Sequence, residues 1–307
     1  MQKTAVAPIR KPSVSMKQAR RRENVAGYLF MAPSLIFFLG FVIFPMVMCL
    51  VYSFTDYTMS SFSFSGLNNY KTMIQDAIFG KALWNTIILV LVSVPITCFF
   101  SLWAASIISK LHDRTTSFFR CVFYLPVVTG SVAVTVVWRW IFNRYYGVLN
   151  YVCMNLGLIS RNMNWLGDAS TALGCIITIL LTTSVGQPIV LYVSALNNVD
   201  QSLVEAASVD GATNMQTFWR IKWPQIMPTT LYILVITTIN SFQCFALIQL
   251  LTSGGPNHAT ETIMYYIYYN AFKLQNYGYG SAMGIILALI IAAFSALQFK
   301  LAKTDNG

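Results

Sequence analysis

The residues best suited to chemistry in this sequence are uncharged polar side chains set inside long apolar segments. Thr237, Asn240, Ser241 and Cys244 follow one another at i, i+3, i+4 and i+7, so they are expected to share one face of a helix. Hydroxyl and amide groups on such a face could exchange hydrogen bonds with an uncharged polyhydroxy ligand, which needs donors and acceptors but no counter-ion. Ile233 is expected on an outward face of the same helix.

Two further segments carry similar stripes of small and polar residues. They comprise Thr178, Thr182 and Gly186 with Gln187 beside them, and Ser131, Thr135 and Trp138. The alternative is that these stripes only hold helices together, because interfaces between membrane helices favour Ser, Thr, Gly and Asn. The sequence leaves both interpretations open.

The composition shows which elements must position these residues. Of 307 residues, 56% are apolar and 10% are charged, against about 25% charged in ordinary soluble domains. We therefore predict an all-α, polytopic membrane protein. Apolar runs long enough to cross a bilayer are found near residues 25–54, 82–109, 118–138, 171–195, 226–251 and 281–299.

The distribution of basic residues predicts the orientation. With the N-terminus inside, 14 Lys and Arg lie in inner segments and 6 in outer ones, as the positive-inside rule expects. Both termini and the loop 197–225 are therefore expected in the cytoplasm. Residues 1–24 are predicted as a basic cytoplasmic segment and residues 25–303 as the six-helix domain. The net charge of +10 does not predict nucleic-acid binding, because seven of the 20 Lys and Arg lie before residue 23.

A polar stretch, EAASVDGATNMQTFWRIKWP, occupies residues 205–224 between two apolar runs. Gly211 can adopt a positive φ and is predicted to turn the chain between two short helices. Asn214 is predicted to cap the second helix, and Pro224 and Pro228 to mark where that helix ends and the next membrane segment begins. We call residues 197–225 the elbow.

The elbow resembles the signature loop of the membrane permeases of bacterial ABC importers. The matching residues are Glu205, Ala206, Ala207, Gly211, Ile221 and Pro224, with Trp223 where the family usually has Leu. The resemblance implies a type I importer permease fold with six transmembrane helices. It also implies that the elbow is a coupling helix docked in a cleft of an ATPase subunit, with Asp210, Phe218 and Trp219 among the coupling residues.

Other stretches resemble the maltose-type, carbohydrate branch of that family. They include Gly66-Leu67 with Asn69-Tyr70, Trp138-Arg139-Trp140, Gly147-Val148-Leu149-Asn150 and Gly254-Gly255-Pro256. In maltose-type permeases the matching helix faces contact sugar. The resemblance therefore implies that five residues of this chain contact the substrate: Ser131, Thr182, Gly186, Ser241 and Cys244. Ser241 and Cys244 stand where the maltose permease has Asn. With Gln187, Thr237 and Asn240 from the stripes, these residues form the predicted substrate site.

The sequence offers no sign of an enzyme or a resident cofactor. It lacks the G-x-x-x-x-G-K-[ST] pattern of a phosphate-binding loop, a metal-ligand cluster and a catalytic triad. The resemblance therefore implies that ATP–Mg is held by a separate subunit. The implied partners are a second permease in a heterodimer, two ATPase subunits, an extracytoplasmic sugar-binding protein and the lipid of a bacterial inner membrane.

Two functions compete. The first is a permease subunit of a binding-protein-dependent carbohydrate importer. The alternative is a self-contained secondary transporter or channel for a small polar solute. Such transporters usually need buried ionisable groups or broken helices; the apolar runs lack the former in their middles and show no clear pair of the latter. The elbow is required by the first function and unexplained by the second. A membrane protein without transport has no feature in its favour.

Overall fold

The computed structural model describes residues 16–304, and within this range the regular elements are helices. The chain divides into two units at Val51–Tyr52. α1 (Met16–Phe38), the π-helical segment η1 (Leu39–Ile43) and α2 (Phe44–Tyr52) form one continuous helix at the start of the described chain, and its apolar part is Glu23–Tyr52. The predicted boundary at residue 24 lies inside α1. Residues 1–15 lie outside the described range, so the basic cytoplasmic segment stays a prediction.

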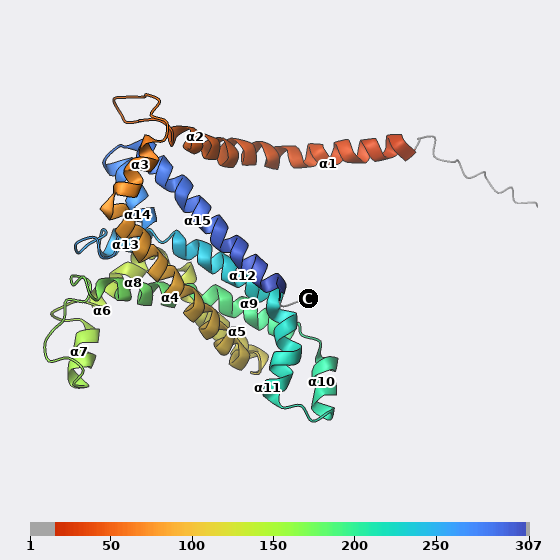
Figure 1. Cartoon of the computed structure of the whole chain (residues 1–307). Helices are drawn as coiled ribbons and strands as arrows, with labels where there is room; N and C mark the ends of the chain where they lie inside the picture. The colour runs from red at the N-terminus through yellow and green to blue at the C-terminus, as the bar shows by residue number, and fades with distance from the viewer. Residues whose placement is uncertain (1–15, 305–307) are drawn as a thin grey trace, which may run out of the picture. The chain divides into compact units, whose positions relative to one another are not determined.

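The second unit is a bundle organised on α4 (Ala77–Ile108), which packs mainly against α9 (Gly186–Asn197) and α12 (Trp223–Phe242) (Figure 1). Ala82, Phe242 and Met283 are fully buried where α4, α12 and α15 meet. The remaining elements are α3 (Asn68–Gln75), α5 (Asp113–Val128), α6 (Ser131–Ile141), α7 (Val148–Asn155), α8 (Ala172–Ser184), α10 (Gln201–Val209), α11 (Asn214–Thr217), η2 (Phe218–Lys222), α13 (Ala246–Leu251), α14 (Ile263–Tyr268), η3 (Tyr269–Lys273) and α15 (Tyr277–Thr304).

Four helices are long and apolar enough to cross a membrane, and the count reaches six if each of two bent helix pairs is one span. The four are Glu23–Tyr52, Ala77–Ile108, Asn214–Leu251 and Tyr277–Leu301. The predicted runs therefore locate the membrane segments. The sequence shows no clear pair of broken helices, but in the structure the third and the fourth run are each bent at a break.

The third run is divided by a bend of 95° between α5 and α6. Thr129 and Gly130 leave the helical conformation there, with ψ angles of 123° and 145°. Pro126, inside the last turn of α5, has no N–H to continue the hydrogen-bond ladder. The single crossing predicted at 118–138 is therefore two helices with different directions.

The fourth run bends by 40° between α8 and α9. Val185 separates the two helices, and Pro188 follows in the first turn of α9, where a missing N–H costs least. Gly186 allows the start of α9 to approach α5 closely, because a Cβ at this position would lie 2.2 Å from the carbonyl oxygen of Phe123. Only a residue without a side chain fits this crossing.

Polar side chains also hold the bundle together at a few points. The hydroxyls of Ser93 and Ser241 lie 3.1 Å apart between α4 and α12. The amide of Gln298 on α15 donates to the hydroxyl of Thr238 at 2.7 Å. Hydrogen bonds of this kind satisfy polar groups that lipid cannot solvate.

One carboxylate ties α4 to the two elements at the other end of the chain. The Oδ1 atom of Asp76 accepts from the backbone N–H groups of Ile78 and Phe79, and so caps α4. Its Oδ2 atom accepts from the hydroxyls of Tyr266 and Tyr279, each at 2.7 Å. Burial alone would raise the pKa of Asp76, but these four hydrogen bonds outweigh it and lower the pKa below the ordinary value of 3.8.

We expect Asp76→Asn to lower the free energy of unfolding by about 2 kcal/mol, because an amide nitrogen cannot accept the two tyrosine hydrogen bonds although the cap is retained. The wild-type contribution is fully present above pH 3.8 and is lost as the pH falls through the lowered pKa of the folded protein. The measurement is the unfolding temperature of the purified protein. Asp168→Asn is the matched control, because Asp168 accepts from Ser170 through Oδ1 alone; equal destabilisation by both variants would contradict the assignment.

Candidate functional site

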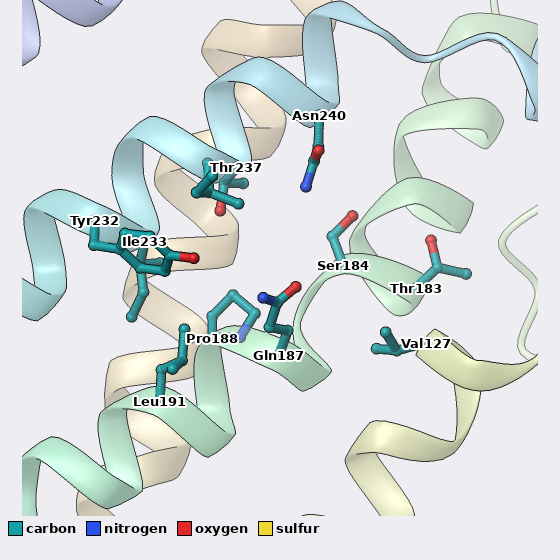
Figure 2. Close-up of a pocket in the computed structure, with 11 residues that line it drawn as sticks. Val127, Thr183, Ser184, Gln187, Pro188, Leu191, Tyr232, Ile233, Thr237 and Asn240 are labelled. Atoms are coloured by element: carbon teal, nitrogen blue, oxygen red, sulfur yellow. The ribbon is translucent and has the colours of Figure 1, made fainter. Parts of the chain in front are cut away.

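A cavity of about 130 Å³ with both polar and apolar side chains in its wall, here called the central cavity, lies between α5, α8, α9 and α12. Gln187 and Asn240 project into it from α9 and α12, and Ser184 lies across from Asn240 (Figure 2). Leu191 and Ile233 supply apolar walls. Amide, hydroxyl and apolar surface together suit a ligand with both hydroxyl groups and a hydrocarbon skeleton.

A second cavity of about 260 Å³ adjoins the central cavity, since Val127 and Thr183 line both. The bend between α5 and α6 opens onto it, with Thr129 and Ser131 in its wall. Gln243 and Cys244 complete its polar lining from the break after α12. Among the described residues, no charged side chain lines either cavity. We call this second space the adjoining cavity.

Five of the eight predicted substrate residues line these spaces. Gln187, Thr237 and Asn240 line the central cavity, and Ser131 and Cys244 line the adjoining cavity. The fold therefore brings three separate polar stripes together. Whether they contact a ligand stays a prediction.

The other three predicted residues are placed elsewhere. Ser241 is only 3% exposed and faces Ser93 of α4. Gly186 is buried against α5. Thr182 is exposed, bonds the carbonyl of Ile179 at 2.7 Å and lines neither cavity. In this conformation Ser241 and Gly186 contribute to helix packing, which is the alternative that the stripes left open.

Three further residues line the central cavity although the helical spacing did not predict them: Thr183, Ser184 and Tyr232. The bend at Val185 explains the first two, because a straight helix would have placed Thr182 and Gly186 on one face. The placement of Ile233 on an outward face is wrong: it is 1% exposed and lines the cavity. Ile233 lies one helical turn before Thr237, so the spacing itself could have shown this.

The elbow is built by two standard helix-terminating devices. Gly211 has a φ of 77°, and the N–H groups of Gly211 and Ala212 donate to the carbonyls of Ser208 and Ala207. This is the Schellman pattern that ends α10, and it confirms the predicted turn at Gly211. The predicted cap is wrong by one residue, because Thr213 and Gln216 form a reciprocal capping box and Asn214 is the first residue of α11.

The prediction that Pro224 and Pro228 separate the elbow from the membrane segment is also wrong. The helix runs without a break from Asn214 through η2 into α12. In η2 the N–H of Trp223 donates to the carbonyl of Phe218, five residues earlier. This wider π-helical turn makes room for the ring of Pro224, which would otherwise collide with the preceding turn.

The elbow presents an apolar surface to its surroundings. Val209, Met215 and Trp219 are 88%, 66% and 53% exposed. Trp219 is held in place by its indole N–H, which lies 3.2 Å from the sulfur of Met215, and by ring contacts with Phe218 and Trp223. Exposed aromatic and methionine side chains of this kind are typical of the centres of protein interfaces.

Not every predicted coupling residue faces outward. Phe218 packs against the core cluster that contains Tyr192 and Ile226, so it anchors the elbow to the bundle. Ile221 and Ala207 are half-buried. The exposed ones are Glu205, Ala206, Asp210, Gly211, Trp219 and Pro224.

Apolar helices bent beside cavities without charged lining residues, and an exposed elbow joined to one of these helices, fit a membrane transport permease. The chain belongs to the family of binding-protein-dependent transport system inner membrane components, whose pattern matches residues 98–304. It is 35% identical over 280 residues to the multiple sugar-binding transport system permease protein MsmF of Streptococcus mutans, covering 90% of this chain and 95% of that protein. It is 30% identical to the lactose transport system permease protein LacF of Rhizobium radiobacter, over 95% and 98% of the two chains. The protein is therefore a multi-pass inner-membrane component.

The fold has a close counterpart among solved structures. A chain of a bacterial alginate ABC transporter, solved in complex with an alginate pentasaccharide-bound periplasmic protein, superposes with a TM-score of 0.79. It is 23% identical and is matched over 91% of this chain and 94% of that chain. The type I importer permease fold predicted from the elbow is thereby confirmed.

Proposed function

We propose that the chain forms half of the path by which an ATP-driven, binding-protein-dependent importer moves a carbohydrate across the bacterial inner membrane. The observation that carries the proposal is the position of Thr237 and Asn240 on α12. They line an uncharged polar cavity on the helix whose other end continues into the elbow. The sugar-transport names of MsmF and LacF support a carbohydrate as the solute.

The partners follow from the same proposal. A second permease, expected to be a different chain, supplies the other half of the path. Two ATPase subunits bind ATP–Mg and receive the elbow, and an extracytoplasmic protein delivers the sugar. Both termini lie in the cytoplasm, and the chain itself is not an enzyme.

The competing function is a self-contained secondary transporter or channel. The bends between α5 and α6 and between α8 and α9 give it support that the sequence had not shown, since broken helices often form ion sites. Family membership and the exposed elbow favour the importer instead. Co-purification with an ATPase subunit separates the two functions.

The central test is ATP hydrolysis by the reconstituted complex with its binding protein, screened over a panel of sugars. The importer predicts hydrolysis that one or a few sugars stimulate. Uptake by liposomes holding this chain alone, driven by an ion gradient, would show the secondary transporter.

We expect Asn240→Leu to reduce sugar uptake by about tenfold or more while assembly survives. The leucine removes an amide from the central cavity and fills it with branched apolar surface, which leaves sugar hydroxyls without partners. The measurement is uptake by proteoliposomes, with the amount of assembled complex quantified beside it.

Ile239→Leu is the matched control, since Ile239 is the neighbouring residue on α12 and lines neither cavity. It should transport at the wild-type rate. Normal uptake by an assembled Asn240→Leu complex would mean that the stripe only packs helices.

A further inference from the structure

A third cavity, of about 180 Å³, lies where the elbow meets the bundle, and the proposed transport path does not use it. Its wall combines the end of α4, the end of α9, α10 and the start of the long helix that begins at Asn214. We call it the elbow cavity. It is lined by Ser106, Ser109, Lys110, Leu196, Val204, Ser208, Ala212, Asn214, Thr217, Phe218 and Lys222.

The charge in the elbow cavity is of one sign. Lys110 and Lys222 reach it from two different elements, while no carboxylate is among the described residues that line it. The single ion pair found in the described part of the chain joins His258 to Glu261, far from here in the sequence. Two lysines therefore line one cavity, and the described part of the chain adds no carboxylate to that lining.

The elbow cavity also offers hydrogen-bond donors that the protein leaves unused. Thr217 is 8% exposed, yet its hydroxyl has no hydrogen-bond partner among the described residues. The side chains of Ser208 and Asn214, which also line the cavity, are exposed. A group with several acceptor oxygens could take hydrogen bonds from these side chains.

We propose that the elbow cavity binds a phosphate-type oxyanion. A phosphate group carries the negative charge and the acceptor oxygens that two ammonium groups, hydroxyls and an amide satisfy together. A carboxylate offers fewer acceptors, and a neutral ligand leaves both lysines unpaired.

The position of the cavity makes a lipid headgroup the first source of that phosphate. The apolar span Ala77–Ile108 ends immediately before Ser109 and Lys110, so the cavity lies at the level where headgroups are found. A soluble phosphate is the second source. In either case the bound anion joins α4, α10 and η2, and so fixes the angle of the elbow.

The experiment uses the full-length chain in micelles of a maltoside detergent, which contains no phosphate. Phosphatidylglycerol is added in one arm and inorganic phosphate in the other, and bound ligand is measured by native mass spectrometry and by the shift in unfolding temperature. Binding in the first arm alone assigns the site to a headgroup, and binding in both assigns it to phosphate from either source. The readout needs no transport, so it stands or fails independently of the proposed function.

The double variant Lys110→Gln and Lys222→Gln should weaken binding by about tenfold or more, since two charge-assisted contacts are lost. Lys222→Arg should retain binding, which separates lost charge from misfolding. Arg220→Gln is the matched control, because Arg220 is exposed on the same π-helical segment but does not line the cavity. Unchanged binding in the double variant, equal loss in Arg220→Gln, or no binding in either arm would overturn the proposal.

Discussion

A Gly211→Asp variant is expected to keep its helices in the membrane and to lose its hold on the ATPase. A Cβ at this position meets no other atom within 4 Å, so the chain itself has room for the side chain. The positive φ costs about 1–2 kcal/mol for a residue with a side chain, which a bundle of this size survives. The new carboxylate, however, lies on the exposed tip of the elbow beside Asp210. We expect retained ATPase to fall by about tenfold and sugar-stimulated hydrolysis to fall with it.

Gly211→Asn separates the effect of the new charge from the effect of backbone strain, because asparagine tolerates the left-handed conformation and carries no charge. It should bind the ATPase better than the Asp variant and worse than the wild type. The measurement is co-purification of the ATPase, followed by hydrolysis in liposomes. Full assembly and full coupling in Gly211→Asp would refute the docking role of the elbow.

A large loss of stability is also expected from Gly186→Ala, although this substitution adds only one methyl group. In Gly186→Ala the added methyl group would lie 2.2 Å from the carbonyl oxygen of Phe123 and 2.8 Å from the side chain of Val127. The backbone oxygen cannot rotate away, so α5 and α9 must separate. Overpacking costs about 1–3 kcal/mol or more, and the central cavity changes shape because Val127 also lines it.

Gly174→Ala is the matched control for this variant. Gly174 lies in α8, the other half of the same bent pair, and a Cβ there meets nothing within 4 Å. We expect it to fold as well as the wild type, whereas Gly186→Ala should give less detergent-stable protein and a lower unfolding temperature. Equal behaviour of the two would mean that the close approach of α5 and α9 is absent, and Gly186 would return as a candidate for ligand contact.

The comparison of these two glycines shows what the sequence could predict. Gly211 was identifiable because a helix-terminating turn depends on a few neighbouring residues, and all of them are visible in the sequence. The role of Gly186 depends on Phe123, a residue in a different helix. No pattern along the chain contains that information.

The predicted substrate residues also differ in whether local sequence is enough to place them. The stripe on α12 was found because the helix is regular through Thr237 and Asn240. On α8 and α9 the sequence predicts Thr182, whereas Thr183 and Ser184 line the cavity in the structure. The prediction fails because it assumes one straight helix, and the chain bends at Val185. The apolar runs located the membrane segments, but the direction of each half of a broken run is set by packing.

The helix from Asn214 to Phe242 is unbroken, so a rotation at one end displaces the other end. At 1.5 Å per residue, roughly 40 Å of helix separate the elbow end from Asn240. A tilt of this helix by about 5° about its elbow end would move the cavity end by about 3.5 Å, slightly more than the diameter of a water molecule. A cavity of about 130 Å³ is small enough for such a stroke to open or close it. A tilt of this helix would therefore change the width of the central cavity beside Asn240.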